Sequence, residues 1–250
     1  TTQYSGFPKI SPDNPQAPCF GPWHMALIGT VPKKMETDMK LANSLPALAL
    51  GLMAASGANA SDLKQSTIMT HPSQGPEMAV EAASAQLAAV DGGAFVSFET
   101  TGLKPGHVHT LWFVAISNPA ACASVPCTGK DVLLNTEAVK GDAGFAGGVI
   151  AAEDGSASFA HFQPQGALTN GWFGTGLNDV ATSEIHLVVK DHGPVIEGRV
   201  ADMLSTFRDA CRTDSIPAAF PEIAFADGAE GPNTCALVQH TAFLATKPGS

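Results

Sequence analysis

The segment HTLWFVAI, residues 109–116, constrains the fold of this chain more than any other feature. From Leu111 to Ile116 its residues are apolar at consecutive positions, so the strand that it predicts is apolar on both faces. A strand of this kind lies in the middle of a sheet that is covered on both sides. The preceding GLKPG, residues 102–106, is a turn signal and indicates where the strand begins.

Several shorter segments predict further strands. The DGG turn at 91–93 lies between two strand-forming runs and predicts a hairpin, and Asp154-Gly155 predicts a second one between 144–152 and 156–162. Residues 183–190 alternate apolar and polar side chains, which directs His186 away from the core face. A last strand is expected at 235–243.

One stretch changes to a helical period. Val200, Met203, Leu204 and Phe207 follow the i, i+3, i+4, i+7 spacing and predict an amphipathic helix. The fold class is therefore mainly β: a single β-sandwich or partly open barrel of about six to eight antiparallel strands, with long loops and one helix, over residues 80–245.

The N-terminal part has the pattern of an export signal. Residues 39–60 combine a basic start, an apolar run and a small-residue ending at Ala60, which predicts a signal peptide and a secreted or periplasmic product. Residues 1–38 are interpreted as an unstructured leader or an over-extended reading frame, with a genuine extension as the alternative. Residues 61–79 are expected to be a flexible lead-in, and residues 246–250 a tail.

Four cysteines follow the predicted cleavage point. An even number in an exported chain favours two disulfides, for which three pairings are possible. Closeness in sequence favours Cys122 with Cys127 and Cys211 with Cys235. The C-x4-C spacing differs from the C-x2-C of common zinc sites, so a disulfide is favoured there.

Charge and missing motifs exclude several classes. The chain has a net charge of −10, which disfavours nucleic acid and anionic membranes as partners, and no apolar run after residue 60 reaches the roughly 18 residues of a membrane span. The G-x-S-x-G, H-E-x-x-H, dinucleotide-binding and Walker motifs do not occur in the sequence.

Histidines are the candidate metal ligands. His107 and His109 have strand i, i+2 spacing, so they share a face and could chelate copper or zinc. Further ligands would come from His161, His186 or His192. The alternative is that these side chains are solvated or structural residues of strands.

Two other groups could form a site. Asp191 and His192, in the DHGP segment at 191–194, could serve as a general acid and base, or order the loop and cap the following helix. Trp172 and Phe173 lie in a glycine-rich loop and could contact a glycan or another apolar partner. Trp112, in contrast, is expected in the core.

Three blocks together carry a resemblance to a family: GLKPGHVHTLWFVAISNPAAC, EIHLVVKDHGPVIEG followed by STF and a cysteine, and NTCALVQHTAF. They resemble a group of exported bacterial proteins of unassigned function with the pattern G-L-x-P-G-x-x-Y-T-L-W, then V-H-L-V-V-x-x-H-G-P, then a cysteine-bearing last strand. The resemblance covers roughly residues 80–245. It implies a secreted β-rich domain and no particular activity.

The pattern also bears on the histidines. An aromatic residue stands in the family where this chain has His109, whereas His186 and His192 fall on pattern positions. A looser similarity to copper/zinc superoxide dismutases rests on the GLKPG turn before a histidine-bearing strand. This chain lacks the histidine cluster of their zinc loop.

These features favour a secreted, disulfide-stabilised β-sandwich that acts as a binding or interaction module for a small molecule, a glycan or a protein. One alternative is a histidine-liganded copper or zinc protein that could be redox active. Another is a hydrolase or lyase that uses Asp191 and His192.

Overall fold

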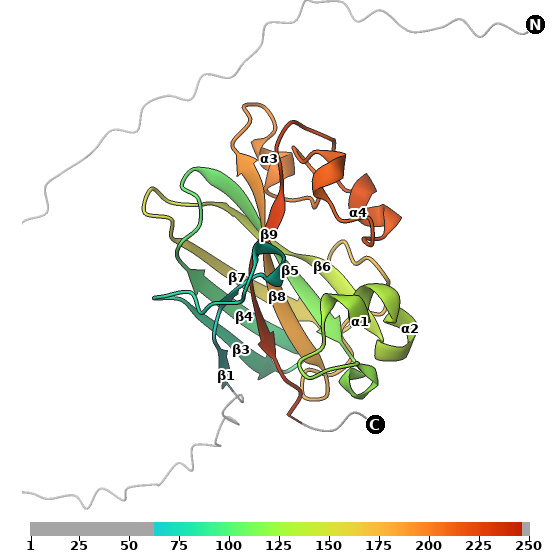
Figure 1. The fold of residues 1–250 in the computed structure, drawn as a ribbon. Helices are drawn as coiled ribbons and strands as arrows, with labels where there is room; N and C mark the ends of the chain where they lie inside the picture. The colour runs from blue at the N-terminus through green and yellow to red at the C-terminus, as the bar shows by residue number, and fades with distance from the viewer. Residues whose placement is uncertain (1–62, 247–250) are drawn as a thin grey trace, which may run out of the picture. The chain divides into compact units, whose positions relative to one another are not determined.

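The computed structural model describes residues 63–246. The predicted leader and signal peptide lie outside these residues. Two antiparallel sheets form a β-sandwich, so the predicted fold class is confirmed (Figure 1). One sheet has four strands in the order β1-β3-β4-β7, and the other has five in the order β2-β9-β8-β5-β6.

The four-stranded sheet consists of β1 (Leu63–Ser66), β3 (Ser84–Val90), β4 (Gly93–Thr100) and β7 (Ala157–Pro164). The five-stranded sheet consists of β2 (Met69–Thr70), β9 (Ala236–Phe243), β8 (Glu184–Pro194), β5 (His107–Ile116) and β6 (Gly141–Ile150). The short helices are η1 (Pro72–Gln74), η2 (Pro119–Ala121), α1 (Gly129–Leu134), α2 (Thr136–Val139), α3 (Val200–Met203), η3 (Thr213–Ser215) and α4 (Glu222–Ala226).

The main core lies between the sheets. Leu111 and Phe113 of β5 and Leu187 of β8 pack there against side chains from β3 and β4 such as Phe98, and all four are fully buried. The alternation predicted for β8 is therefore confirmed. Strand β5 is buried on its other face as well, through Trp112 and its neighbours, because two segments cover the outer face of the five-stranded sheet.

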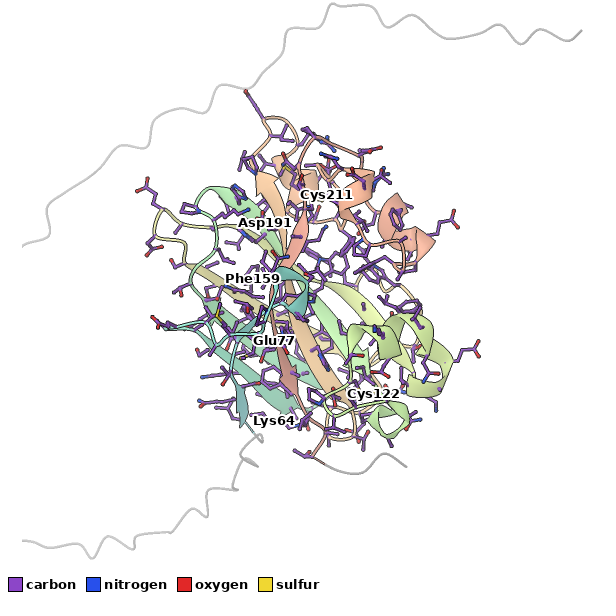
Figure 2. The ribbon with its side chains drawn as sticks, in the orientation of Figure 1. Lys64, Glu77, Cys122, Phe159, Asp191 and Cys211 are labelled. Carbon is purple, nitrogen blue, oxygen red and sulfur yellow. A yellow bond between two sulfur atoms is a disulfide. The ribbon has the colours of Figure 1, made fainter. Side chains whose placement is uncertain are left out.

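These two covers determine the shape of that outer face. Residues 117–140, here called the disulfide loop, contain α1, α2 and the Cys122–Cys127 disulfide. Residues 195–234, the C-terminal cover, contain α3 and α4, and Cys211 in it is bonded to Cys235. Figures 1 and 2 show the two covers at opposite ends of the sheet, marked by Cys122 and Cys211. The pairing favoured by closeness in sequence is the one observed.

Two local predictions are wrong. Residues 61–79 are not a flexible lead-in throughout, because β1 pairs along its backbone with β3, and Ile68 is fully buried in the core. The predicted second hairpin does not form, since β6 pairs with β5 and β7 pairs with β4 in the other sheet. The chain crosses between the sheets at the Asp154-Gly155 turn.

The predicted amphipathic helix is reduced to the single turn α3. The hydroxyls of Ser205 and Thr206 donate to the carbonyls of Ala201 and Asp202, a side-chain pattern that competes with helix continuation. The predicted stripe still packs inward, because Met203 and Phe207 are buried. No helix in residues 63–246 has the length and hydropathy needed to cross a bilayer.

Candidate functional site

A pocket of about 470 Å³ lies on the outer face of the five-stranded sheet and is lined by residues of both covers. Its floor is formed by side chains of β5, β6, β8 and β9, including Trp112, Val114 and Val188. Ligand sites are commonly concave, mostly apolar and of this size. This pocket is the candidate site.

One part of the wall is aromatic. Trp112, Trp172, Phe207 and Phe220 line the pocket and pack on one another, with ring centroids of Trp172 and Phe207 4.8 Å apart and of Trp112 and Trp172 5.2 Å apart. The indole N–H of Trp112 donates to the hydroxyl of Thr110 at 3.0 Å. The indole N–H of Trp172 is buried and has no hydrogen-bond partner in the described part of the chain.

The loop that holds Trp172 is anchored by a buried carboxylate. Asp142 of β6 accepts hydrogen bonds from the backbone N–H groups of Phe173 and Gly176, both at 2.9 Å, and the backbone N–H of Trp172 donates to the carbonyl of Ala143. Trp172 therefore lines the pocket as a half-buried residue. Phe173 instead packs on the core cluster of the disulfide loop and borders a separate, open surface hollow.

The other part of the pocket carries polar groups. His71, which follows β2, lines it together with His186 of β8, His240 of β9 and Glu77. Figure 2 shows Glu77 in the middle of the domain, between the labelled ends of the two covers. Two imidazoles pair with carboxylates at 2.6 Å: His186 Nε2 with Glu184 Oε1, and His240 Nε2 with Glu77 Oε1.

The pair formed by His107 and His109 lies elsewhere, at the start of β5. Both rings face Asp191: His107 Nδ1 is 2.9 Å from Asp191 Oδ1, and His109 Nε2 is 3.9 Å from the same oxygen. His109 is almost fully buried, which lowers its pKa through desolvation. The oxygen also accepts the N–H of Gly193 at 2.6 Å, so the carboxylate is already satisfied by the protein.

His192 does not join that pair. It lies on the outer face of β8, fully buried under the C-terminal cover. Its Nδ1–H donates to the carbonyl of Asp209 at 3.0 Å, and the hydroxyl of Thr110 donates to its Nε2 at 2.9 Å. Burial, followed by the charge of Lys190, lowers the His192 pKa to about 3. Both ring nitrogens form hydrogen bonds within the protein, so the role of this ring is structural.

The same strand carries a buried lysine. Lys190 lies with its ammonium nitrogen 4.3 Å from the centre of the Phe207 ring, and desolvation lowers its pKa to about 7. His161 lies on β7 in the other sheet, where its Nε2 is 3.3 Å from Gln163 Oε1, and burial lowers its pKa. It is therefore separate from the other four predicted metal ligands.

Only one trio of His, Cys, Asp or Glu residues between 63 and 246 has its ligand atoms within 4.8 Å of one another. It consists of His192, Cys211 and Cys235. The two sulfurs are bonded to each other, and His192 Nδ1 carries a proton, as its hydrogen bond to Asp209 requires. With this bonding, the trio has no thiolate to offer a metal.

No sequence pattern predicts the residues that give the pocket its polar part. His71, Glu77 and His240 come from opposite ends of the domain and form no motif. The available signal was strand alternation in 235–243, which places His240 and Ala242 on one face, opposite the buried Thr241.

Comparison with known proteins adds no further assignment. No family model matches the chain, and neither a curated protein nor a solved structure matches it significantly. The candidate function therefore depends on the site itself.

Proposed function

We propose that this disulfide-stabilised β-sandwich is a binding module for a small, mainly apolar molecule, and that the pocket between the two covers is its ligand site. The pocket carries the proposal, because it has a volume of about 470 Å³ and a predominantly apolar lining. A rigid sheet forms its floor, and a disulfide restrains each cover.

The alternatives have less support. A copper or zinc protein would use histidines that lie in separate places: His161 on the other sheet, His186 in the pocket, and His107 with His109 against Asp191. A hydrolase or lyase based on Asp191 and His192 would need a cavity beside them. Both side chains are buried, and neither lines the pocket.

Export is part of the same proposal. Two disulfides are typical of proteins in oxidising compartments. The signal pattern at 39–60 supports the same location.

Titration of the purified protein with N-phenyl-1-naphthylamine, a neutral fluorescent probe, tests the proposal. We expect saturable binding of one probe per chain. Val188→Phe places a larger side chain on the pocket floor and should weaken binding at least tenfold. The matched control is Val90→Phe, at an exposed valine of the four-stranded sheet, which should leave binding unchanged. Absence of saturable binding, or equal weakening by both variants, would refute the pocket as the ligand site.

A further inference from the structure

The polar part of the pocket contains three imidazoles whose proton positions follow from their hydrogen bonds. His71, His186 and His240 all line the pocket. Each uses one ring nitrogen in a hydrogen bond to the protein, and the other nitrogen has no partner among the described residues. The hydrogen-bonding groups that a ligand meets there can therefore be deduced.

His186 presents an acceptor. The buried oxygen Glu184 Oε1 accepts the backbone N–H of Cys127 and lies 2.6 Å from His186 Nε2. A carboxylate oxygen can only accept, so Nε2 carries the proton. In the neutral ring Nδ1 then has a free lone pair.

His240 repeats this arrangement on the neighbouring strand. Its Nε2 donates to Glu77 Oε1 at 2.6 Å, which leaves Nδ1 as the acceptor. His240 lies opposite Val188 in the β8–β9 register, and Ala242 lies opposite His186, so the two histidines are diagonal neighbours on one sheet face. Burial lowers the pKa of His240 and favours the neutral ring.

His71 has the opposite polarity. Its Nδ1 accepts the backbone N–H of Ser73 at 3.2 Å and lies 2.8 Å from the Ser73 hydroxyl, which can donate to the same nitrogen. With Nδ1 as the acceptor, the neutral ring carries its proton on Nε2, which is a donor. Its ring centroid is 5.5 Å from that of His240. Desolvation, with the nearby His240 as a second cause, lowers the His71 pKa to about 4.

Two acceptors and one donor beside an aromatic wall match one kind of ligand. We propose that the pocket binds a planar aromatic molecule with a hydroxyl group, of the phenol class, and this inference rests on the proposed function above. The ring packs against Trp112, Trp172 and their neighbours. The hydroxyl donates to His186 Nδ1 or His240 Nδ1 and accepts from His71 Nε2–H.

The same geometry disfavours anions. A carboxylate or phosphate would meet the two lone pairs, with the charges of Glu77 and Glu184 behind them. An apolar molecule without a donor would leave both lone pairs desolvated and unpaired, which costs binding energy. Selectivity should therefore depend on the ligand's O–H group.

Three matched naphthalenes test this inference: 2-naphthol, 2-methoxynaphthalene and 2-naphthoate, titrated into the full chain at pH 7.5 by calorimetry. One hydrogen bond predicts that naphthol binds about fivefold to tenfold more tightly than the methyl ether. Naphthoate should bind most weakly.

Two variants locate the acceptor. His240→Leu leaves Glu77 half exposed to water, and the double variant His186→Leu with Glu184→Gln avoids leaving a buried unpaired charge. At least one of them should abolish the preference for naphthol. His161→Leu, a histidine of the other sheet, is the control and should keep it.

The outcomes separate the two proposals. Equal binding of naphthol and its methyl ether, or a preference that persists in both variants, would overturn the phenol inference while the binding pocket stands. If no naphthalene binds, the proposed function itself fails.

Discussion

His186 and His192 stand on the same face of β8, yet the two ends of that strand make different use of them. His192 is fully enclosed and has both nitrogens in hydrogen bonds to the protein. His186 borders the pocket and has one nitrogen bound and one open. The same residue type is thus a structural group at one end and a candidate ligand contact at the other.

The difference comes from what packs on each histidine. At His192 the C-terminal cover brings the carbonyl of Asp209, whose buried carboxylate forms an ion pair at 2.9 Å with the partly exposed Arg199. At His186 the partner is Glu184, two residues earlier on the same strand. A partner from the histidine's own strand leaves the space above the ring open, whereas a partner from a cover fills it.

The largest effect should come from His192→Leu. This change leaves the Asp209 carbonyl buried without a partner and removes the acceptor of the Thr110 hydroxyl, which should lower the free energy of unfolding by about 2–4 kcal/mol. His240→Leu, in the open region, should cost less than about 1 kcal/mol, because Glu77 is half exposed and regains water. Urea unfolding of both variants measures the difference. Equal losses would mean that the two regions are not distinct.

Acid should destabilise the folded protein through two histidines, the enclosed His192 and the pocket residue His71, whose pKa values are lowered. The pKa of His192 is about 3 in the folded protein and 6.5 in the unfolded reference, and that of His71 is about 4. Below pH 6.5 the unfolded chain binds protons that the folded chain does not. The free energy of unfolding therefore falls as the pH falls from 6.5 towards 3–4.

Between pH 6.5 and 5 the contribution of His192 to this loss is about 1.5 kcal/mol. That of His71 is smaller, because water screens a half-buried ring. Urea unfolding at several pH values measures how the free energy of unfolding depends on pH. His192→Leu should reduce this pH dependence by the contribution of His192. An unchanged slope in this variant would show that His192 has the same pKa in the folded protein as in the unfolded chain.

Strands β5 and β8, the first hairpin and both disulfides could be predicted because their signals are local. The apolar run in HTLWFVAI predicts a strand that is buried on both faces. The apolar residues Ile185, Leu187 and Val189 alternate with other side chains, which predicts one buried face. Even so, β8 runs four residues beyond the predicted strand, to Pro194. This extension places Asp191 and His192 inside the sheet instead of in a loop.

The pocket could not be predicted, because its residues meet only through the sheet order. β2 and β9 pair at Met69 and His240, which brings His71 beside a strand near the other end of the chain. Because that pairing is made by backbone hydrogen bonds, no pattern of apolar residues in the sequence predicts it. The pattern that the sequence does show is the pair of His107 and His109. In the structure both side chains face Asp191 at the start of β5, away from the pocket.

The two tryptophans that line the pocket, Trp112 and Trp172, provide the smallest and most selective test of the comparison. The indole N–H of Trp112 donates to the Thr110 hydroxyl, which in turn donates to His192. These three side chains form a hydrogen-bonded chain, here called the closed network. Trp172 lines the same pocket, but its N–H is buried without an acceptor. Trp112→Phe should therefore cost about 1–2 kcal/mol of unfolding free energy, for the lost hydrogen bond and contact area.

Trp172→Phe should change the unfolding free energy by no more than about 0.5 kcal/mol, because removing an unsatisfied N–H offsets the lost contact area. Urea unfolding followed by far-ultraviolet circular dichroism compares the two variants without relying on tryptophan emission. A cost for Trp172→Phe equal to that for Trp112→Phe would show that the Trp172 N–H has an acceptor in solution. The boundary between the closed network and the open pocket would then lie beyond Trp172, towards the histidines.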